Sequence, residues 1–261
     1  MDLNLTGKRA LVCGSTQGIG RATVEELAAM GASITLLARR EEKLKEIRDN
    51  LIKTSSAKHH YLVADFDHPE EVQSVIGAYA KEEGIDILVN NTGGPPAGTA
   101  FDAPLNAYAS AFANHLLCNQ ALVQAVVPAM KKTGFGRIIN IISISVRMPI
   151  KGLGVSNTIR GAVANWAKTL SMELGPFGIT VNNVLPGYCM TARLESLLRQ
   201  RAEASGKTFE EIKESLKSEI PAGRISEPHE IAVAVAFLAS PAASYINGIN
   251  IPVDGGRLGC Y

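Results

Sequence analysis

Cysteine is scarce in this sequence, and the cysteines that it has are far apart. The four of them are Cys13, Cys118, Cys189 and Cys260. No two have the close spacing of a zinc or redox pair, so the sequence predicts neither a metal site nor a disulfide framework. Reduced thiols in a cytoplasmic protein are the simplest expectation.

Long apolar runs and an excess of one charge are also absent. No run reaches the roughly 18 residues that a membrane span needs, and residues 1–8 lack the apolar core of a signal peptide. The chain has 26 basic and 25 acidic residues, a balance that argues against electrostatic binding to nucleic acid or to a membrane surface. We therefore expect a cytoplasmic protein with no nucleic-acid or membrane partner.

Short β-rich segments alternate with longer helical segments along most of the chain. Strands are expected at 9–13, 33–38, 61–64, 85–89, 137–142, 179–184 and 249–253. Helices are expected at 19–30, 41–51, 69–83, 105–131, 154–174 and 228–239, and the long one is expected to be interrupted or bent near Pro128. This alternation is typical of βαβ units, so the sequence predicts one α/β domain over residues 1–261. The domain is expected to contain a doubly wound parallel sheet of about seven strands with helices on both faces.

A glycine-rich turn lies directly between the first expected strand and the first expected helix. Its residues are Gly14, Ser15, Thr16, Gln17, Gly18, Ile19 and Gly20. Here the chain turns sharply and presents backbone N–H groups and a helix N-terminus, which suit a pyrophosphate. Glycine serves because a Cβ would obstruct the turn or the approach of the phosphates. The alternative is a tight connection without a ligand, and the position after the first strand favours the binding site.

Three further motifs follow later strands. They are Asn90-Asn91-Thr92-Gly93, Pro186-Gly187 with Thr191, and Gly248 through Val253-Asp254-Gly255-Gly256. With the glycine-rich turn they resemble the short-chain dehydrogenase/reductase family over essentially the full length, and most closely its 3-oxoacyl-(acyl carrier protein) reductase branch. The resemblance implies a Rossmann-type fold, a nicotinamide cofactor, and a small carbonyl, alcohol or acyl substrate. It also implies a homotetramer or homodimer.

The resemblance assigns cofactor contacts residue by residue. Asp65 would accept a hydrogen bond from the adenine amino group, unless it is a solvated loop carboxylate or a helix cap. Thr191 would reach the carboxamide, or would only cap the following helix. The crevice beside the cofactor would be lined by Asn90, Asn91, Gly93, Pro186 and Gly187.

The residues after the second expected strand discriminate between the two nicotinamide cofactors. A carboxylate there would receive the ribose 2′-hydroxyl of NAD, whereas this chain has Arg39 and Arg40. Guanidinium groups pair with phosphate in bidentate fashion, so NADP(H) is favoured over NAD(H). The alternative is a solvated arginine pair beside Glu41 and Glu42.

The family's catalytic pattern is where this sequence departs. The resemblance implies an asparagine, a serine, a tyrosine, and a lysine four residues after the tyrosine. Ser143 retains the serine, but Ser156 stands in the tyrosine position and Arg160 in the lysine position. None of the six tyrosines has a lysine four residues later. The asparagine position falls on His115, or on Asn114 if the register shifts by one residue.

These replacements are expected to preserve cofactor binding and to remove the usual proton transfer. The Ser156 hydroxyl is a far weaker acid than a phenol and is too short to reach the place of a phenolic oxygen. Arg160 keeps the positive charge and the donors for the cofactor ribose, but it does not release its proton. Ser143 either binds a substrate carbonyl or is a helix-capping or core hydroxyl.

Two residues remain as candidate proton donors. His115 has an ordinary pKa of about 6.5, and it either exchanges a proton or is a satisfied core residue. Tyr188 follows Pro186-Gly187 and is expected to overhang the substrate pocket, where it is an acid or a wall that sets specificity.

Two amphipathic segments, 192–204 and 209–219, interrupt the strand–helix alternation. We expect them to form a helical cap, over residues 192–220, that closes over the substrate. The alternatives are a surface excursion or an oligomer contact.

Two functions remain open at this point. The first is an NADP(H)-dependent oxidoreductase, similar to 3-oxoacyl-(acyl carrier protein) reductase, that acts on a carbonyl or alcohol with an atypical proton donor or water. The second is a catalytically impaired NADP(H)-binding homologue that serves as a sensor or as a structural partner in an oligomer.

Overall fold

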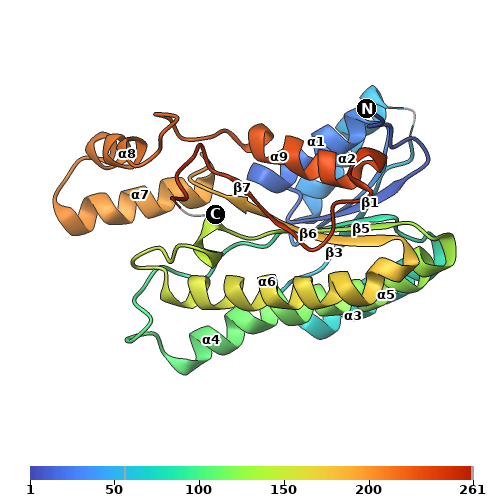
Figure 1. The fold of residues 1–261 in the computed structure, drawn as a ribbon, viewed down its shortest axis with the longest axis horizontal. Coiled ribbons are helices and arrows are strands. Elements are labelled where there is room, and N and C mark those ends of the chain that lie inside the picture. The colour runs from blue at the N-terminus through green and yellow to red at the C-terminus, as the bar shows by residue number, and fades with distance from the viewer. Residues whose placement is uncertain (56, 260–261) are drawn as a thin grey trace.

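The centre of the molecule is a single sheet of seven parallel strands (Figure 1). The computed structural model describes residues 1–55 and 57–259, so Cys260 and Tyr261 lie outside the described residues. The strands are β1 Arg9–Cys13, β2 Ser33–Ala38, β3 His60–Val63, β4 Ile87–Asn90, β5 Gly136–Ile141, β6 Ile179–Pro186 and β7 Asn250–Val253. Their order is β3-β2-β1-β4-β5-β6-β7. The α/β class and the seven parallel strands are as predicted.

The sheet is covered by helices on both faces, as β1 shows most simply. Ala10 and Val12 pack into one apolar core, whereas Leu11 and Cys13 pack into another. Successive side chains of a strand point to opposite faces, so the four consecutive apolar residues after Arg9 require burial on both sides. The alternation along β1 therefore fixes a layer of helices above and below the sheet.

The two helical layers are plain in Figure 1. One face carries α1 Gly18–Ala29, α2 Glu41–Thr54 and α9 Pro228–Ala239. The other carries α3 Pro69–Glu82, α4 Leu105–Phe112, α5 Cys118–Thr133 and α6 Gly154–Leu174. None of the helices in the described part of the chain combines the length and hydropathy that a bilayer crossing demands.

The order of the strands reverses between β1 and β4. β1 pairs with β2 on one side and with β4 on the other. The connection after β1 therefore leads toward one edge of the sheet, and the connection after β4 leads toward the opposite edge. In sheets of this kind the loops at the carboxyl ends separate at such a switch point and leave a crevice. The topology therefore predicts the place of a binding site before any side chain is considered.

The long helix expected at 105–131 differs from the prediction. It is interrupted by a π-helical turn, Ala113–Leu117, between α4 and α5, and Pro128 lies inside α5 without ending it. The helix is therefore not interrupted at Pro128, and the break lies at the π-helical turn instead. Val126 and Met130 on either side of the proline are fully buried, and this packing holds the helix together despite the missing N–H donor.

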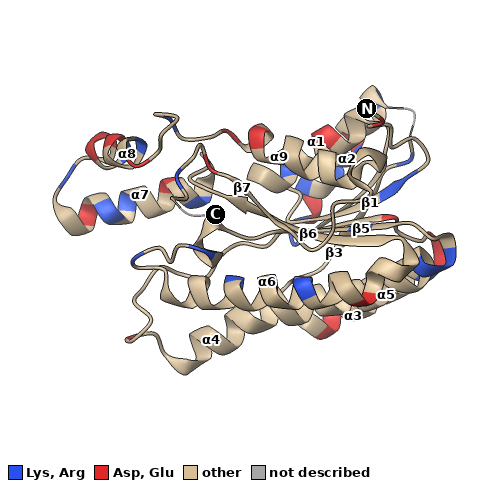
Figure 2. Ribbon diagram, in the orientation of Figure 1, with Lys and Arg blue, Asp and Glu red and all other residues tan. Residues whose placement is uncertain are grey.

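The two segments of the expected cap are helices, α7 Ala192–Ser205 and α8 Phe209–Ser218. They extend beyond the sheet as the orange part of the chain in Figure 1. Leu194, Leu198, Ile212 and Leu216 form a small apolar cluster between them, and Figure 2 marks acidic and basic residues along both helices. The cap thus has its own core and a charged outer surface.

Four asparagines form a row of hydrogen bonds across one half of the sheet. Asn90 donates to Asn140, Asn140 to Asn183, and Asn183 to Asn250, each at 2.8 Å. Consecutive members are register partners on β4, β5, β6 and β7. Because a slip of one residue would turn each amide to the other face, the row fixes the register of four strands.

We expect Asn140→Leu to lower the free energy of unfolding by about 2–5 kcal/mol, because it leaves a donor of Asn90 and an acceptor of Asn183 buried without partners. Equilibrium urea denaturation measures this loss. Asn165→Leu is the control, since Asn165 is exposed on α6, and it should shift the free energy by less than about 0.5 kcal/mol. Equal losses in the two variants would contradict the structural role of the row.

Candidate functional site

A cleft of about 1050 Å³ opens at the carboxyl ends of the strands, at the switch point. The glycine-rich turn and the ends of β2, β3, β4, β5 and β6 contribute to it, and α7 borders it. The cleft brings together these residues singled out from the sequence: Gly14, Thr16, Gln17, Gly18, Ile19, Arg39, Arg40, Asp65, Asn91, Gly93, Ser143, Ser156, Arg160, Pro186, Gly187, Tyr188 and Thr191. Ser15, Gly20, Asn90 and His115 lie outside its lining.

The glycine-rich turn is shaped by close backbone contacts. Gly14 and Gly18 have φ angles of +58° and +53°, which other residues rarely adopt. A Cβ on Gly20 would lie 2.2 Å from the Gly14 carbonyl oxygen, so only glycine lets α1 begin so near the turn. Asn91 Nδ2 donates to the Cys13 and Gly14 carbonyls at 3.3 and 3.4 Å, which joins the turn to the end of β4.

Ser15 and Gly20 support the turn and do not face the cleft. The Ser15 side chain is fully buried, and its Oγ donates to the Leu37 carbonyl at 3.4 Å. Asn90 is likewise buried and belongs to the asparagine row. In the structure these three residues position the neighbours that line the cleft.

Two arginines flank the cleft at the end of β2. Arg40 Nη2 donates to Gln17 Oε1 at 3.3 Å, and Arg39 Nη1 lies 3.7 Å from Asp65 Oδ2. The Arg39 side chain is 67% exposed. Ion pairs this exposed contribute little to the stability of the fold, so Arg39 can rearrange easily to meet a ligand. The end of β2 therefore offers guanidinium groups and no carboxylate of its own.

Arg160 is buried, with 9% of its surface exposed. Its Nη1 donates to the Ile141 carbonyl at 3.1 Å and its Nη2 to the Thr92 carbonyl at 3.3 Å. Burial, followed by the nearby charge of Arg193, lowers the pKa of Arg160 to about 10, so the group stays charged at neutral pH. One face of the guanidinium thus joins β5 to the loop after β4, while the side chain still lines the cleft.

Ser143 performs one of its two expected roles in the structure. It caps the short 3₁₀ helix Ile144–Val146, where its Oγ accepts the Ser145 N–H at 3.0 Å. Because a hydroxyl that accepts one hydrogen bond still has its own proton to donate, and because Ser143 lines the cleft, it retains a donor for a substrate oxygen. Ser156 also lines the cleft, from the first turn of α6.

His115 does not match the expectation of a proton exchanger. It is 2% exposed, and burial, with the Arg160 charge as a second cause, lowers its pKa to about 2. The imidazole is therefore neutral throughout the physiological range and fills the core, the alternative that the sequence left open. An acid with this pKa holds no proton to transfer near neutral pH.

The π-helical turn resolves the register of the asparagine position. A π turn accommodates one extra residue, and it places Asn114 in the lining of the cleft, whereas His115 is buried. Asn114 Nδ2 donates to Asp67 Oδ1 at 2.6 Å. Of the two candidates, Asn114 is thus the one that faces the cleft.

Tyr188 lies in the wall of the cleft, with its hydroxyl engaged at the junction with the cap. The hydroxyl accepts from Arg257 Nη2 at 2.8 Å and donates to Glu219 Oε2 at 3.3 Å, and the Arg257 guanidinium stacks 3.9 Å from the ring centroid. These contacts favour a role for Tyr188 as a wall of the substrate pocket over a role as a proton donor. Cys189 beside it is buried, which raises the pKa of its thiol to about 11 and makes it unreactive.

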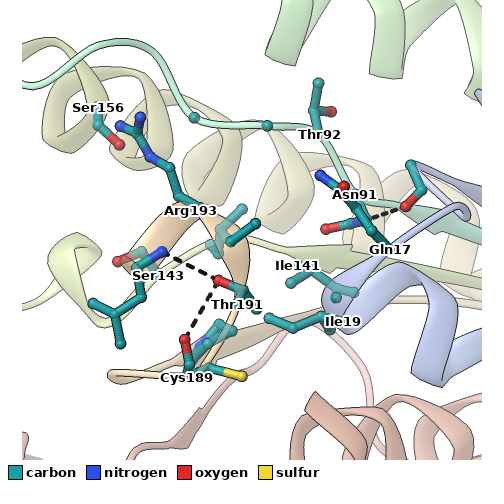
Figure 3. A pocket seen from close by; sticks show the side chains of 18 of the residues that line it. Gln17, Ile19, Asn91, Thr92, Ile141, Ser143, Ser156, Cys189, Thr191 and Arg193 are labelled. Atoms are coloured by element: carbon teal, nitrogen blue, oxygen red, sulfur yellow. Dashed lines mark hydrogen bonds between the residues drawn. The ribbon is translucent and has the colours of Figure 1, made fainter. Parts of the chain in front are cut away.

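Thr191 caps α7, which is one of the two roles that the sequence left open for it. Its Oγ1 accepts the Leu194 N–H at 3.3 Å and donates to the Cys189 carbonyl at 3.4 Å, and Figure 3 shows it at the centre of the cleft. A Cβ on Gly18 would lie 3.2 Å from the Thr191 methyl group. The capping residue therefore also rests against the glycine-rich turn.

One cleft residue that the sequence did not single out is Arg193. It occupies the first turn of α7, and its side chain reaches across the cleft toward Ser156 (Figure 3). A basic residue near the expected beginning of the cap was the only available signal, since the direction of the side chain depends on how α7 docks. Within the described residues, no group of acidic, histidine or cysteine side chains is arranged to hold a metal ion.

Comparisons with known proteins agree with this geometry. The family described as enoyl-(acyl carrier protein) reductase matches residues 14–257. The 3-oxoacyl-[acyl-carrier-protein] reductase FabG of Vibrio cholerae is 33% identical over 97% of this chain and 98% of its own. The corresponding protein of Haemophilus influenzae is 35% identical over 97% and 98%.

Solved structures give the same result. L-sorbose reductase from Gluconobacter frateurii, complexed with NADPH and L-sorbose, superposes with a TM-score of 0.94 at 30% identity over all of both chains. A putative NAD(P)-dependent gluconate 5-dehydrogenase from Beutenbergia cavernae, with bound NADP, gives 0.91 at 29% identity, again over all of both chains. With the switch-point cleft and its glycine-rich turn, these matches establish that the chain belongs to the short-chain dehydrogenase/reductase family.

Proposed function

We propose that this protein is an NADP(H)-dependent oxidoreductase that interconverts a carbonyl and an alcohol with a proton donor other than the family tyrosine. The observation that carries the proposal is the composition of the cleft. It combines a glycine-rich turn, two arginines at the end of β2 and the Ser143 hydroxyl in one continuous lining. Relatives that are reductases, among them one complexed with NADPH, support it.

The residues of the cleft fit a dinucleotide along its whole length. The backbone N–H groups of the turn and the N-terminus of α1 face the place of a pyrophosphate, and Arg39 and Arg40 face that of a 2′-phosphate. At Gly93, which lines the cleft, a Cβ would meet nothing within 4 Å, so space for the ligand is present. When bound, the cofactor supplies or accepts the hydride.

The chain's own residues act on the substrate oxygen. Ser143 donates a hydrogen bond to it and polarises the carbonyl, and the positive field of Arg160 favours negative charge that develops there. Asn114 borders the same space. Because Ser156 is a weak acid, His115 is neutral and the Tyr188 hydroxyl is engaged by Glu219 and Arg257, we assign the final proton to water in the cleft.

The cap fits a role over the substrate. Leu197 and Leu198 of α7 line the cleft together with Tyr188, so the cap supplies an apolar wall beside the reacting groups. We further propose a cytoplasmic homotetramer, by analogy with the family.

One observation favours a second function, a cofactor-binding homologue without turnover. Ser156 fills the position of the proton donor, and the Arg160 guanidinium already donates hydrogen bonds to the Ile141 and Thr92 carbonyls. Such a protein would bind NADP(H) and report its level, or would stabilise an oligomer.

Binding and turnover separate the two functions. We expect NADPH to bind in a fluorescence titration and to be consumed in the presence of at least one member of a panel of ketoses, keto acids and 3-oxoacyl thioesters. Binding without consumption on the whole panel would leave the sensor as the function. Absence of NADPH binding would overturn both.

Arg39→Ala/Arg40→Ala should raise the Kd for NADPH at least about tenfold, because it removes the charge-assisted contacts to the 2′-phosphate. The Kd for NADH should change less than about twofold, since NADH lacks that group. Arg48→Ala is the control, because Arg48 pairs with Asp49 and does not line the cleft. A parallel loss of affinity for both cofactors would show that the arginines do not read the 2′-phosphate.

Ser156→Tyr/Arg160→Lys should raise kcat for carbonyl reduction by about 10²-fold, since it restores a general acid of the family type. Ser156→Phe/Arg160→Lys adds the same ring without the hydroxyl and should give no gain. A rate measured from pH 6 to 10 should then fall at high pH only in the tyrosine variant. An equal gain with phenylalanine would mean that the ring shapes the pocket and that the proton has another source.

A further inference from the structure

Two guanidinium groups meet at one side of the cleft. Arg160 comes from α6 and Arg193 from the first turn of α7. Both lie against Gly94, where a Cβ would be 3.7 Å from Arg160 Nη2 and 3.8 Å from Arg193 Nε and Nη2. Arg193 Nη2 also donates to the Pro95 carbonyl. These contacts use few of the ten N–H donors that two guanidinium groups carry.

Neither of these charges is neutralised by the protein. In residues 1–55 and 57–259, every ion pair involves other side chains, such as Arg199 with Glu195 on the same helix at 2.6 Å. Desolvation lowers the pKa of both arginines, and Arg193 lowers that of Arg160 as a second cause. Arg160 is buried and Arg193 beside it is exposed. A like charge next to a buried one is unfavourable unless an anion joins them.

The position of Arg193 on its helix adds to the imbalance. The N-terminus of a helix carries partial positive charge and favours acidic residues, yet Arg193 is the second residue of α7. The positive charge of Arg193 therefore does not stabilise α7. A ligand that enters the cleft with negative charge would compensate all three positive groups.

The pair of arginines lies on the substrate side of the cleft, away from the glycine-rich turn. The turn contacts α7 through Thr191, which rests against Gly18. Arg193 instead contacts Gly94 and Pro95. In Figure 3 it points toward Ser156 at the left, whereas Gln17 and Ile19 of the turn lie at the right. The phosphates of a dinucleotide at the turn would thus leave this pair free.

We propose that Arg193, supported by Arg160, binds the carboxylate of the substrate, which is a small keto or hydroxy acid. The proposal rests on the proposed function for the reacting carbonyl, which Ser143 would hold. A planar guanidinium matches a carboxylate in bidentate fashion. Ile150, Leu153 and Leu197 line the same cleft and suit the short carbon chain of such an acid.

The test is calorimetric titration of malonate, with malonamide as its neutral counterpart, into the protein with and without NADP⁺. We expect malonate to bind and malonamide not to bind. Arg193→Met should raise the Kd for malonate at least about tenfold, because it removes one charge-assisted bidentate contact. The same variant should leave the Kd for NADP⁺ within about twofold of the wild-type value. Arg199→Met, the matched control on α7, should change neither.

Three results would overturn the proposal. They are no malonate binding to the wild-type protein, unchanged malonate affinity in Arg193→Met, and an equal loss of NADP⁺ affinity in that variant without malonate. The last would assign Arg193 to the cofactor's pyrophosphate. Failure of the proposed function is distinguishable, because a protein that binds malonate but not NADP⁺ keeps the arginine site and loses the cofactor.

Discussion

The buried Arg160 guanidinium holds the floor of the cleft together. It donates to the Ile141 carbonyl at the end of β5 and to the Thr92 carbonyl after β4, and so joins the two loops that separate at the strand ends. The planar fork of arginine reaches two carbonyls at once, whereas lysine presents one compact charge. Arg160 is therefore a structural link as well as a charge.

This link explains how the cofactor cleft is retained while the usual acid is missing. A lysine in this place would lower the pKa of a neighbouring tyrosine, but the neighbour here is Ser156, which has little to gain from that charge. The positive charge remains, and Arg193 has moved in beside it. The substitutions at 156 and 160 are thus consistent with one another: the site gives up a phenolic acid and gains a concentration of positive charge suited to an anion.

The sequence predicted the sheet and most helices because their patterns are local and strong. The helices at 154–174 and 228–239 have the predicted bounds, and the residues of the glycine-rich turn lie where the first βαβ unit requires them. The asparagine row was not foreseen, because it depends on the register of four strands. Arg193 was missed for a similar reason, since its position follows from the docking of α7.

The π-helical turn shows why the asparagine position was ambiguous. A count along a regular helix leads to His115, but one extra residue in the turn moves Asn114 into the cleft and His115 into the core. Both side chains are polar, so composition does not distinguish them. Burial decides the matter, because it lowers the pKa of His115 to about 2 and removes it from proton transfer at neutral pH.

A crystal structure of the protein with NADP⁺ bound tests the central claim most directly. The nucleotide should lie across the carboxyl ends of β1, β2 and β4 with its 2′-phosphate beside Arg39 and Arg40, and Arg160 should keep its bonds to the Ile141 and Thr92 carbonyls. A complex in which Arg160 leaves both carbonyls, or in which the nucleotide lies outside this cleft, would contradict the claim that Arg160 preserves the cofactor site as a structural link.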